Sequence, residues 1–421
     1  MLHKILIMAV MACAGLGVFA ADPTATTYTA TQCLGSAMPY PAPEAPAAYP
    51  DSLTPVMVNH VGRHGARFLS SSRTTTELTE ALQRADSAGV LSPLGKELLG
   101  IARYVSETSR NRWGALDSLG MAEQRGIASR MFMAYPMLFT DGSVSAISSY
   151  SPRCVMSMYE FTHQLDRLNH HVELYTSAGH QNSPLMRPFD TDKAYIEWAD
   201  SREWEPPYNM FFDTTAPASP ARRLVTSENF LSAAEAQQLS WTEYKVLAGL
   251  PAMGLDFDIT RFFTLEELNS LWACENLGHY LRRTATVLSQ EPALIASDLL
   301  LDIITTIDEA VEMGKAPYGA RLRFGHAETL MPLLSLMRLK GCYYMTNYYD
   351  TVALHWKDFD IVPMAANLQI VLFRTDKKDW CVRVDLNERP VPLLPNSDRI
   401  YTPWSEARDY LTRCLPLIMQ P

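Results

Sequence analysis

The sequence lacks the short motifs that most often mark a nucleotide-binding or metal-dependent protein. It contains no glycine-rich phosphate loop, no G-x-S-x-G turn and no H-E-x-x-H pair. None of its cysteines stand in a C-x-x-C spacing, so the sequence indicates no zinc site. The pairs Asp190-x-Asp192 and Asp256-x-Asp258 lack the other ligands of a metal pattern, and solvated loops explain them better. We therefore expect neither a metal nor a cofactor.

Basic tracts are also missing from the chain. Lysine and arginine number 36 against 46 acidic residues, which gives a formal net charge of −10. Because nucleic-acid binding needs a clustered excess of cations, nucleic acid is not an expected partner. An acidic protein can still bind a small anionic molecule when its cations gather in one cleft, and this is the ligand class that we expect.

Only one long apolar run is present, and it lies at the N-terminus. Lys4 precedes the stretch 5–19, which is too short for a comfortable membrane span and ends in Val18-Phe19-Ala20, a cleavage-like pattern. We expect residues 1–20 to be a signal peptide and the protein to be periplasmic or secreted. Cys13 weakly resembles a lipobox cysteine, so an outer-membrane lipoprotein is the alternative.

Cysteine is scarce, with seven in the chain and six after cleavage at Ala20. In an exported protein an even number permits up to three disulfides, and their pairing cannot be deduced from the sequence.

The hydrophobic pattern predicts strands toward both ends of the chain and helices between them. The expected strands cover 55–61, 143–150, 320–325, 368–374 and 380–386, and the expected helices 77–88, 93–108, 120–135, 155–169 and 329–339. This order predicts an α/β core with an inserted helical cap. We expect a Pro/Ala-rich segment at 21–50, the core at 51–169 and 316–421, and the mainly helical cap at 170–315.

The most informative run is Arg63-His64-Gly65-Ala66-Arg67, which follows a Val-rich strand. Arginine is permanently charged and its planar fork matches phosphate oxygens. A neutral imidazole between two cations suits attack on phosphorus, because the cations lower its pKa. Gly65 lets the backbone turn sharply and an oxyanion approach. The competing interpretation is that these residues only form a solvated rim at the end of the strand. Their position in a loop that leaves a buried strand favours a functional site instead.

A second run, His326-Ala327-Glu328, follows the expected strand 320–325. The period of two in extended backbone lets His326 and Glu328 face the same way. A carboxylic acid there can protonate a leaving alkoxide. Zinc deaminases also use His-x-Glu, but with a following Pro-Cys-x-x-Cys that is absent here. Arg153, at the end of the strand 143–150, is alone an ordinary surface arginine, yet as a third strand-end cation it becomes a candidate phosphate ligand.

These residues together resemble the histidine acid phosphatases, the second branch of the histidine phosphatase superfamily. Most phosphatases of the branch carry His-Asp in the second motif, whereas His-Ala-Glu, as at 326–328, is typical of the multiple inositol-polyphosphate phosphatases. The segment 385–388, Asp-Leu-Asn-Glu, is also similar to that subfamily. The resemblance spans roughly residues 50–395 and implies a phosphoglycerate-mutase-like α/β core sheet flanked by helices, with an inserted, mostly helical cap.

The resemblance also implies roles for the site residues. His64 would be the nucleophile, passing through a phosphohistidine, and Glu328 would protonate the leaving oxygen and then activate water. The phosphoryl oxygens would be bound by Arg63, Arg67, Arg153 and His326. Phytate (InsP6) and related inositol polyphosphates would be the substrates, and such polyanions need further cations. Arg187 is our candidate for one, against its interpretation as a surface arginine; Lys193 and Arg202 carry less support.

Two other functions remain open at this point. A broad-specificity acid or sugar phosphatase would use the same chemistry, and His-Ala-Glu favours the inositol polyphosphates over it. A non-catalytic binder of phosphorylated ligands would keep only the fold, and the intact His64 and Glu328 argue against it.

Overall fold

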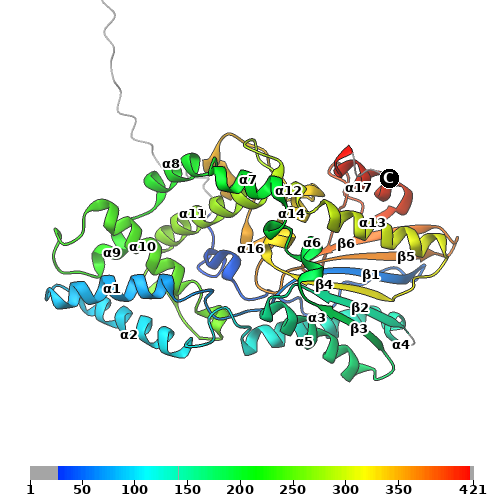
Figure 1. Cartoon of the computed structure of the whole chain (residues 1–421), viewed down its shortest axis with the longest axis horizontal. Helices are drawn as coiled ribbons and strands as arrows, with labels where there is room; N and C mark the ends of the chain where they lie inside the picture. Colours follow the sequence, from blue (N-terminus) through cyan, green and yellow to red (C-terminus); the bar gives the residue numbers. More distant parts are fainter. Residues whose placement is uncertain (1–26, 141, 418–421) are drawn as a thin grey trace, which may run out of the picture.

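The computed structural model describes residues 27–140 and 142–417 of the chain (Figure 1). The expected signal peptide and Cys13 lie outside these residues. Within the described ranges, no helix combines the length and apolar character needed to cross a membrane. The six cysteines of the described residues are all free, and five of them are buried.

A single mixed sheet forms the centre of the fold. Its strands are β1 (Leu53–Arg63), β2 (Ser143–Ser148), β3 (Glu173–Ala178), β4 (Ala320–Gly325), β5 (Asn367–Thr375), β6 (Trp380–Leu386), β7 (Arg389–Val391) and β8 (Tyr401–Pro403). They follow the order β3-β2-β4-β1-β5-β6-β7, with β8 paired to β6. The four strands β3, β2, β4 and β1 are parallel, and the remaining pairings are antiparallel.

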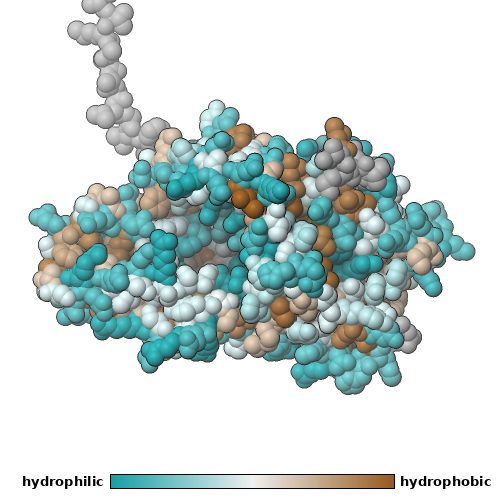
Figure 2. Space-filling model, in the orientation of Figure 1, coloured by the Kyte–Doolittle hydropathy of each residue, from teal (hydrophilic) through white to brown (hydrophobic). Residues whose placement is uncertain are grey.

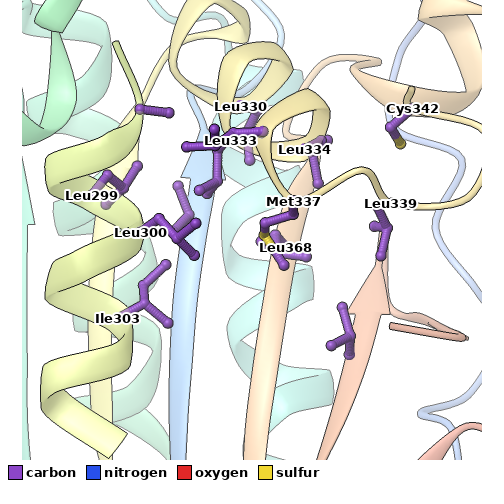
Figure 3. Close-up of a cluster of buried hydrophobic side chains, with 14 of the residues drawn as sticks. Leu299, Leu300, Ile303, Leu330, Leu333, Leu334, Met337, Leu339, Cys342 and Leu368 are labelled. Carbon is purple, nitrogen blue, oxygen red and sulfur yellow. The ribbon is translucent and has the colours of Figure 1, made fainter. Parts of the chain in front are cut away.

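Helices cover both faces of this sheet. On one face lie α13 (Ser297–Glu312), α14 (Ala327–Leu336) and α17 (Trp404–Cys414), and on the other lie α3 (Ser118–Ala134) and α5 (Pro152–Leu168). Strand β5 shows why both faces need a cover, because it carries apolar side chains on each. Leu368, Ile370 and Leu372 pack in the core with α13, α14 and α17, and Val371 and Phe373 pack in the core with α3 and α5. This alternation follows from the period of two in a strand. Figure 3 shows Leu368 below the leucines of α14 and to the side of Leu300 of α13.

A separate helical lobe lies beside the sheet, at the left in Figure 1. Its core joins η1 (Gln32–Ala37), α1 (Arg73–Ser87), α2 (Pro93–Thr108), α9 (Ser219–Arg223), α10 (Ala233–Leu247) and α11 (Leu265–Arg283). Four further helices are α6 (Ser183–Met186), α7 (Lys193–Ser201), α8 (Glu205–Thr215) and α12 (Glu291–Leu294). Helix α8 packs against α11, α7 against α12, α12 against α14, and α6 against α13. The remaining short helices are α4 (Met137–Thr140), α15 (Val352–His355) and α16 (Asp358–Ile361), with 3-10 turns at 180–182, 188–190, 251–253, 259–261 and 349–351.

The α/β core with a helical cap is confirmed, and its packing assigns three segments differently from the sequence expectation. Helices α1 and α2 pack with α10 in the helical lobe, although 51–169 was expected to be core. Strand β3 pairs with β2, and α13 covers the sheet, although both lie within 170–315. The reason is that amphipathic patterns show which face is buried but not against which partner. Edge strand β3 is also largely exposed, so it lacks a buried strand's pattern.

Candidate active site

The sheet brings the two motifs together. β1 and β4 are parallel neighbours in a register that pairs Arg63 with Gly325, so both strands end at the same edge. The backbone N–H of His64 donates to the carbonyl of Gly325 at 3.1 Å. The imidazole rings of His64 and His326 consequently lie 5.6 Å apart, centre to centre. Ligands of open α/β sheets bind at this carboxyl edge, which makes it the candidate site.

A cavity of about 430 Å³ opens at this edge, between the sheet and the helical lobe. Its walls include Arg63, His64, Arg67, Arg153, Lys245 and Glu328. The surface drawn in Figure 2 is hollowed between the two lobes and mostly hydrophilic around the hollow. The cavity is large enough for a small-molecule ligand.

His64 is held as a neutral base with one nitrogen free. Its Nδ1 lies 2.9 Å from the carbonyl oxygen of Gly65, which can only accept, so Nδ1 carries the proton and Nε2 has the lone pair. Burial, and then the charges of Arg63 and Arg153, lower the pKa of His64 well below its ordinary value. The ring therefore stays neutral at acidic pH, as a nucleophile requires.

Three arginines surround this ring with unused donors. Arg63, Arg67 and Arg153 each have a buried Nε that finds no hydrogen-bond partner among the described residues. Buried donors nearly always have a partner, and all three arginines lie on the wall of one cavity, where their guanidinium groups would suit an anion with several oxygens. Burial, reinforced by the neighbouring arginines, lowers the pKa of Arg63 to about 10 and that of Arg67 to about 9. An anion between them would relieve this repulsion.

A second nitrogen of the Arg63 guanidinium, Nη1, is hydrogen-bonded to the backbone. It donates to the carbonyls of Ser36 at 2.6 Å and Val362 at 2.5 Å. Such anchoring fixes the guanidinium before a ligand arrives, so little side-chain entropy is lost on binding.

His326 directly follows β4 and caps α14, and Arg187 lies against it. Nη1 of Arg187 donates to Nε2 of His326 at 2.8 Å, and because Nε2 accepts, the ring is neutral. Burial, with Arg153 and Arg187 nearby, lowers the pKa of His326 to about 3, although Glu328 acts in the opposite direction. The hydroxyl of Ser149 contacts the same nitrogen at 3.1 Å.

Arg187 is therefore not an isolated surface arginine. Its guanidinium lies between the rings of Tyr150 and Phe189, at 4.9 and 4.8 Å from their centres. Asp190 binds its Nε at 2.6 Å, and Tyr150 donates to the same carboxylate oxygen of Asp190 at 3.1 Å. The other two candidate cations do not join the site. Lys193 is exposed, and Arg202 is exposed and paired with Glu205.

Glu328 lies in the first turn of α14 and faces the cavity. The sequence predicted that His326 and Glu328 face the same way because alternate residues of a strand do so. That reason is wrong, because the strand ends at Gly325 and Glu328 is helical. Burial alone would raise the pKa of Glu328, but Arg283 and His326 hold it well below its usual range. With no anion in the site, this carboxylate is ionised.

Several supporting residues carry no recognisable sequence signal. Gln124 of α3 donates to the carbonyl of Arg63, and Glu123 accepts from the backbone of Ala66 at 2.7 Å. Ser157, one turn after Arg153, accepts from the backbone of Gly65 at 3.1 Å. These bonds fix the loop that carries His64, and only the position of Ser157 relative to Arg153 hinted at such a role.

Gly65 itself is needed for a different reason from the one expected. A Cβ there would lie 2.4 Å from the carbonyl oxygen of Gly120, and one on Gly120 would lie 2.1 Å from that of Ala66. The two glycines let the loop that carries His64 pack directly on α3. Close packing of backbone on backbone, rather than room for an oxyanion, explains the glycine.

A second group of charged residues lines the cap side of the cavity. Lys245 of α10 pairs with Glu275 of α11, and His279 lies between Glu275 and the fully buried Asp358. Lys245 is the only lysine on the cavity wall among the described residues, and Glu275 already balances its charge.

The segment 385–388 supports the fold rather than the site. Glu388 binds Arg130 of α3 through both oxygens, at 2.7 and 2.8 Å. Asn387 accepts from the backbone of Asn367, the first residue of β5. The segment thus fixes β5, whose N-terminal end borders the site, to α3.

The model of the histidine phosphatase superfamily, branch 2, matches residues 56–387, and the chain belongs to this family. The resemblance noted in the sequence is confirmed, and the protein is a hydrolase of the histidine acid phosphatase class. Among the described residues, no group of three or more His, Cys, Asp or Glu side chains is arranged to hold a metal ion.

Within the family the chain is similar to multiple inositol polyphosphate phosphatases. The human enzyme, multiple inositol polyphosphate phosphatase 1, is 29% identical over 398 residues, covering 85% of this chain and 80% of the relative. The chicken enzyme of the same name is 25% identical, covering 87% and 83%. In structure, the Bifidobacterium longum multiple inositol polyphosphate phosphatase in complex with inositol hexasulfate has a TM-score of 0.75 at 17% identity, covering 92% of this chain and 99% of that one. The phytase from D. castellii has a TM-score of 0.64 at 15% identity, covering 94% and 88%.

Proposed function

We propose that this protein is an exported phosphomonoesterase that hydrolyses inositol polyphosphates such as phytate through a phosphohistidine. One observation carries the chemistry: three arginines on the wall of one cavity surround a histidine whose Nε2 has a free lone pair. Phosphoryl transfer depends mainly on positioning and on stabilising charge, which such a set of fixed cations supplies.

In the first step, Nε2 of His64 attacks phosphorus and forms a P–N bond as the bond to the ester oxygen breaks. Glu328, which takes up a proton when the anionic substrate binds beside it, gives that proton to the departing oxygen, so the product leaves as an alcohol. In the second step, water attacks phosphorus, Glu328 takes the proton of that water, and the P–N bond breaks. The imidazole and the carboxylic acid are thereby restored, and inorganic phosphate is released.

The substrate class rests on the relatives and on the cavity. The human and chicken relatives are named for inositol polyphosphates, and the Bifidobacterium structure holds inositol hexasulfate. The cavity of about 430 Å³ in this chain presents cations on the core side and Lys245 on the cap side. Phosphates around a ring would meet both sides at once.

A broad-specificity acid or sugar phosphatase is the second candidate. It is favoured by the pairing of Lys245 with Glu275, which leaves the cap wall with little free positive charge. A substrate with a single phosphate would need only the core side. A non-catalytic phospholigand binder is the least supported, because His64 and Glu328 face one cavity with their reactive atoms available.

Incubation of the purified protein with phytate, with the inositol phosphates resolved over time, tests the substrate. We expect successive release of phosphate, faster at equal concentration than from glucose phosphates. A clear preference for glucose phosphates or a generic aryl ester would favour the second candidate. Phosphate binding without turnover of any ester would favour the non-catalytic one.

Export rests on residues 1–20 alone. We expect the mature protein to begin close to residue 21 and to appear in the periplasm or medium, which cell fractionation and N-terminal sequencing can check. Incorporation of a labelled fatty acid that is lost in Cys13→Ser would show the lipoprotein alternative instead.

A further inference from the structure

Glu328 has a partner on the cap that neither sequence motif contains. Arg283 is the last residue of α11, and its Nη2 lies 4.0 Å from an oxygen of Glu328. The pair connects the helical lobe to the first turn of α14. At this distance the charges attract strongly, yet the carboxylate is not held by a short hydrogen bond and can still turn toward a ligand.

Arg283 is fixed from its other side. Its Nη1 donates to the hydroxyl of Tyr195 at 2.5 Å, and that hydroxyl lies 3.5 Å from the carbonyl of Arg282. Tyr195 is only 5% exposed and packs with Trp198 and Ile295. The guanidinium also stands over the rings of Phe189 and Tyr195, at 5.8 and 6.0 Å. A long side chain held in this way keeps one geometry with little further loss of entropy.

We propose that Arg283, held by Tyr195, is a positioning residue for Glu328 that directs the carboxylate toward the leaving-group side of the site. This inference rests on the proposed function, in which Glu328 gives and retakes the proton. Arg283 acts on Glu328 electrostatically and touches no reacting atom.

The neighbouring Arg282 shows that the arrangement is specific. It has the same charge and leaves the same helix end, but its Nε donates to the carbonyl of Gly278 and its guanidinium covers the ring of Trp204. It therefore provides a matched control, one residue away and directed elsewhere.

The pH dependence follows from the charges around Glu328. The groups that interact electrostatically with Glu328 are Arg63 of β1, Arg67 of the following loop, Cys154 of α5, Tyr195 of α7, Arg283 of α11 and His326, the residue after β4. Arg283 is the strongest of the groups that lower the pKa of Glu328. An opposite charge within 4–6 Å lowers a carboxyl pKa by about 1–3 units, so its removal raises the pKa by a similar amount.

The test compares Arg283→Gln with Arg282→Gln across pH, on phytate and on an aryl phosphate. The alkaline limb of kcat/KM requires protonated Glu328, so in Arg283→Gln we expect this limb at a pH higher by about 1–3 units. We also expect kcat/KM on phytate, which covers the steps through breakage of the ester bond, to fall by about tenfold, with a smaller loss on the aryl ester, whose leaving group needs no acid. Arg282→Gln should match the wild type.

Two further variants keep the test decisive if Arg283→Gln folds poorly. Arg283→Lys retains the charge, so its alkaline limb should stay near that of the wild type. Tyr195→Phe removes only the hydroxyl, and should lower kcat/KM on phytate without changing kcat/KM on the aryl ester. Thermal melts with and without inorganic phosphate show that each variant is folded and binds anions.

Three results would overturn the inference: an unchanged alkaline limb in Arg283→Gln, equal losses on both esters, or a rise in KM alone, which would make Arg283 a phosphate ligand. Glu328→Gln separates this failure from that of the proposed function. If Glu328→Gln spares kcat/KM on the aryl ester and Arg283→Gln behaves like Arg282→Gln, only the positioning role fails. If Glu328→Gln shows no such selectivity, the proposed mechanism fails and this inference fails with it.

Discussion

Nη1 of Arg187 lies 2.8 Å from Nε2 of His326, although 139 positions separate the two residues in the chain. The contact places a cation from the loop after α6 against the second motif. Because Arg187 is held by Asp190 and two aromatic rings, it reaches His326 in a fixed orientation. The site of this protein is thus built from four segments, namely 63–67, Arg153, Arg187 and 326–328, rather than from two motifs.

Replacement of Arg187 by alanine is expected to lower kcat/KM on phytate by about 10²-fold, the usual cost of one fixed donor to a phosphoryl group. Arg202→Ala, which removes an exposed arginine paired with Glu205, is the matched control and should behave like the wild type. Steady-state kinetics on phytate distinguish the two. A loss in Arg187→Ala no greater than that in Arg202→Ala would mean that Arg187 takes no part in binding or turning over the substrate.

His64→Ala is expected to abolish phosphate release, with kcat falling by roughly 10⁴-fold or more, since no other group can form the covalent intermediate. His171→Ala, at an exposed histidine before β3, serves as the control. Acid-quenched enzyme should contain a P–N bond in the wild type and none in His64→Ala. Turnover near the wild-type rate in the variant would remove His64 from the nucleophilic role.

Glu328→Gln keeps the shape of the side chain but cannot supply a proton. We expect kcat on alkyl phosphates such as phytate to fall by about 10²–10⁴-fold, the usual contribution of general acid catalysis. Activated aryl esters should lose far less in the first step. Rates on a series of esters with graded leaving groups measure this, and a loss independent of the leaving group would argue against Glu328 as the acid.

Stability should fall as the pH falls, and His60 offers a clean measure of it. This buried ring lies between Phe161 and Phe324, both of its nitrogens lack a partner among the described residues, and burial lowers its pKa to about 3. Unfolding restores the ordinary pKa of about 6.5, so the unfolded chain binds more protons below that pH. The neutral ring of His60 therefore makes its full contribution to the free energy of unfolding above pH 6.5. This contribution is lost as the pH falls from 6.5 toward 3.

Urea unfolding of the wild type and of His60→Leu at pH 7 and pH 5.5 tests this linkage. Between these values the wild type should lose about 1 kcal/mol more free energy of unfolding than the variant, because leucine takes up no proton. His60 lies outside the cavity wall, so the activity of the variant reports on the fold. Equal losses in both proteins would mean that His60 is not held neutral by the fold.

Treatment with a chelator is expected to leave phosphate release unchanged. The arginines supply the charge that a metal would otherwise provide. Activity after dialysis against EDTA, with and without added divalent cations, measures this. A loss restored by one cation would contradict the mechanism proposed for this site.

The sequence alone predicted the chemistry of each short motif and most of the local structure. A histidine between arginines after a Val-rich strand, and an acid three residues after another strand, are local patterns whose meaning depends on neighbours in the chain. For the same reason the expected strands and helices correspond to β1, β2, β4, β5, β6 and to α1, α2, α3, α5 and α14.

Only the tertiary structure decided which distant groups join the site. The register of β1 and β4 sets the distance between His64 and His326. The packing of α11 against the core brings Arg283 to Glu328, and the loop after α6 brings Arg187 to His326. An arginine looks the same in a sequence whether it faces water or a phosphate site. Its environment depends on contacts across the whole fold, which no local period encodes.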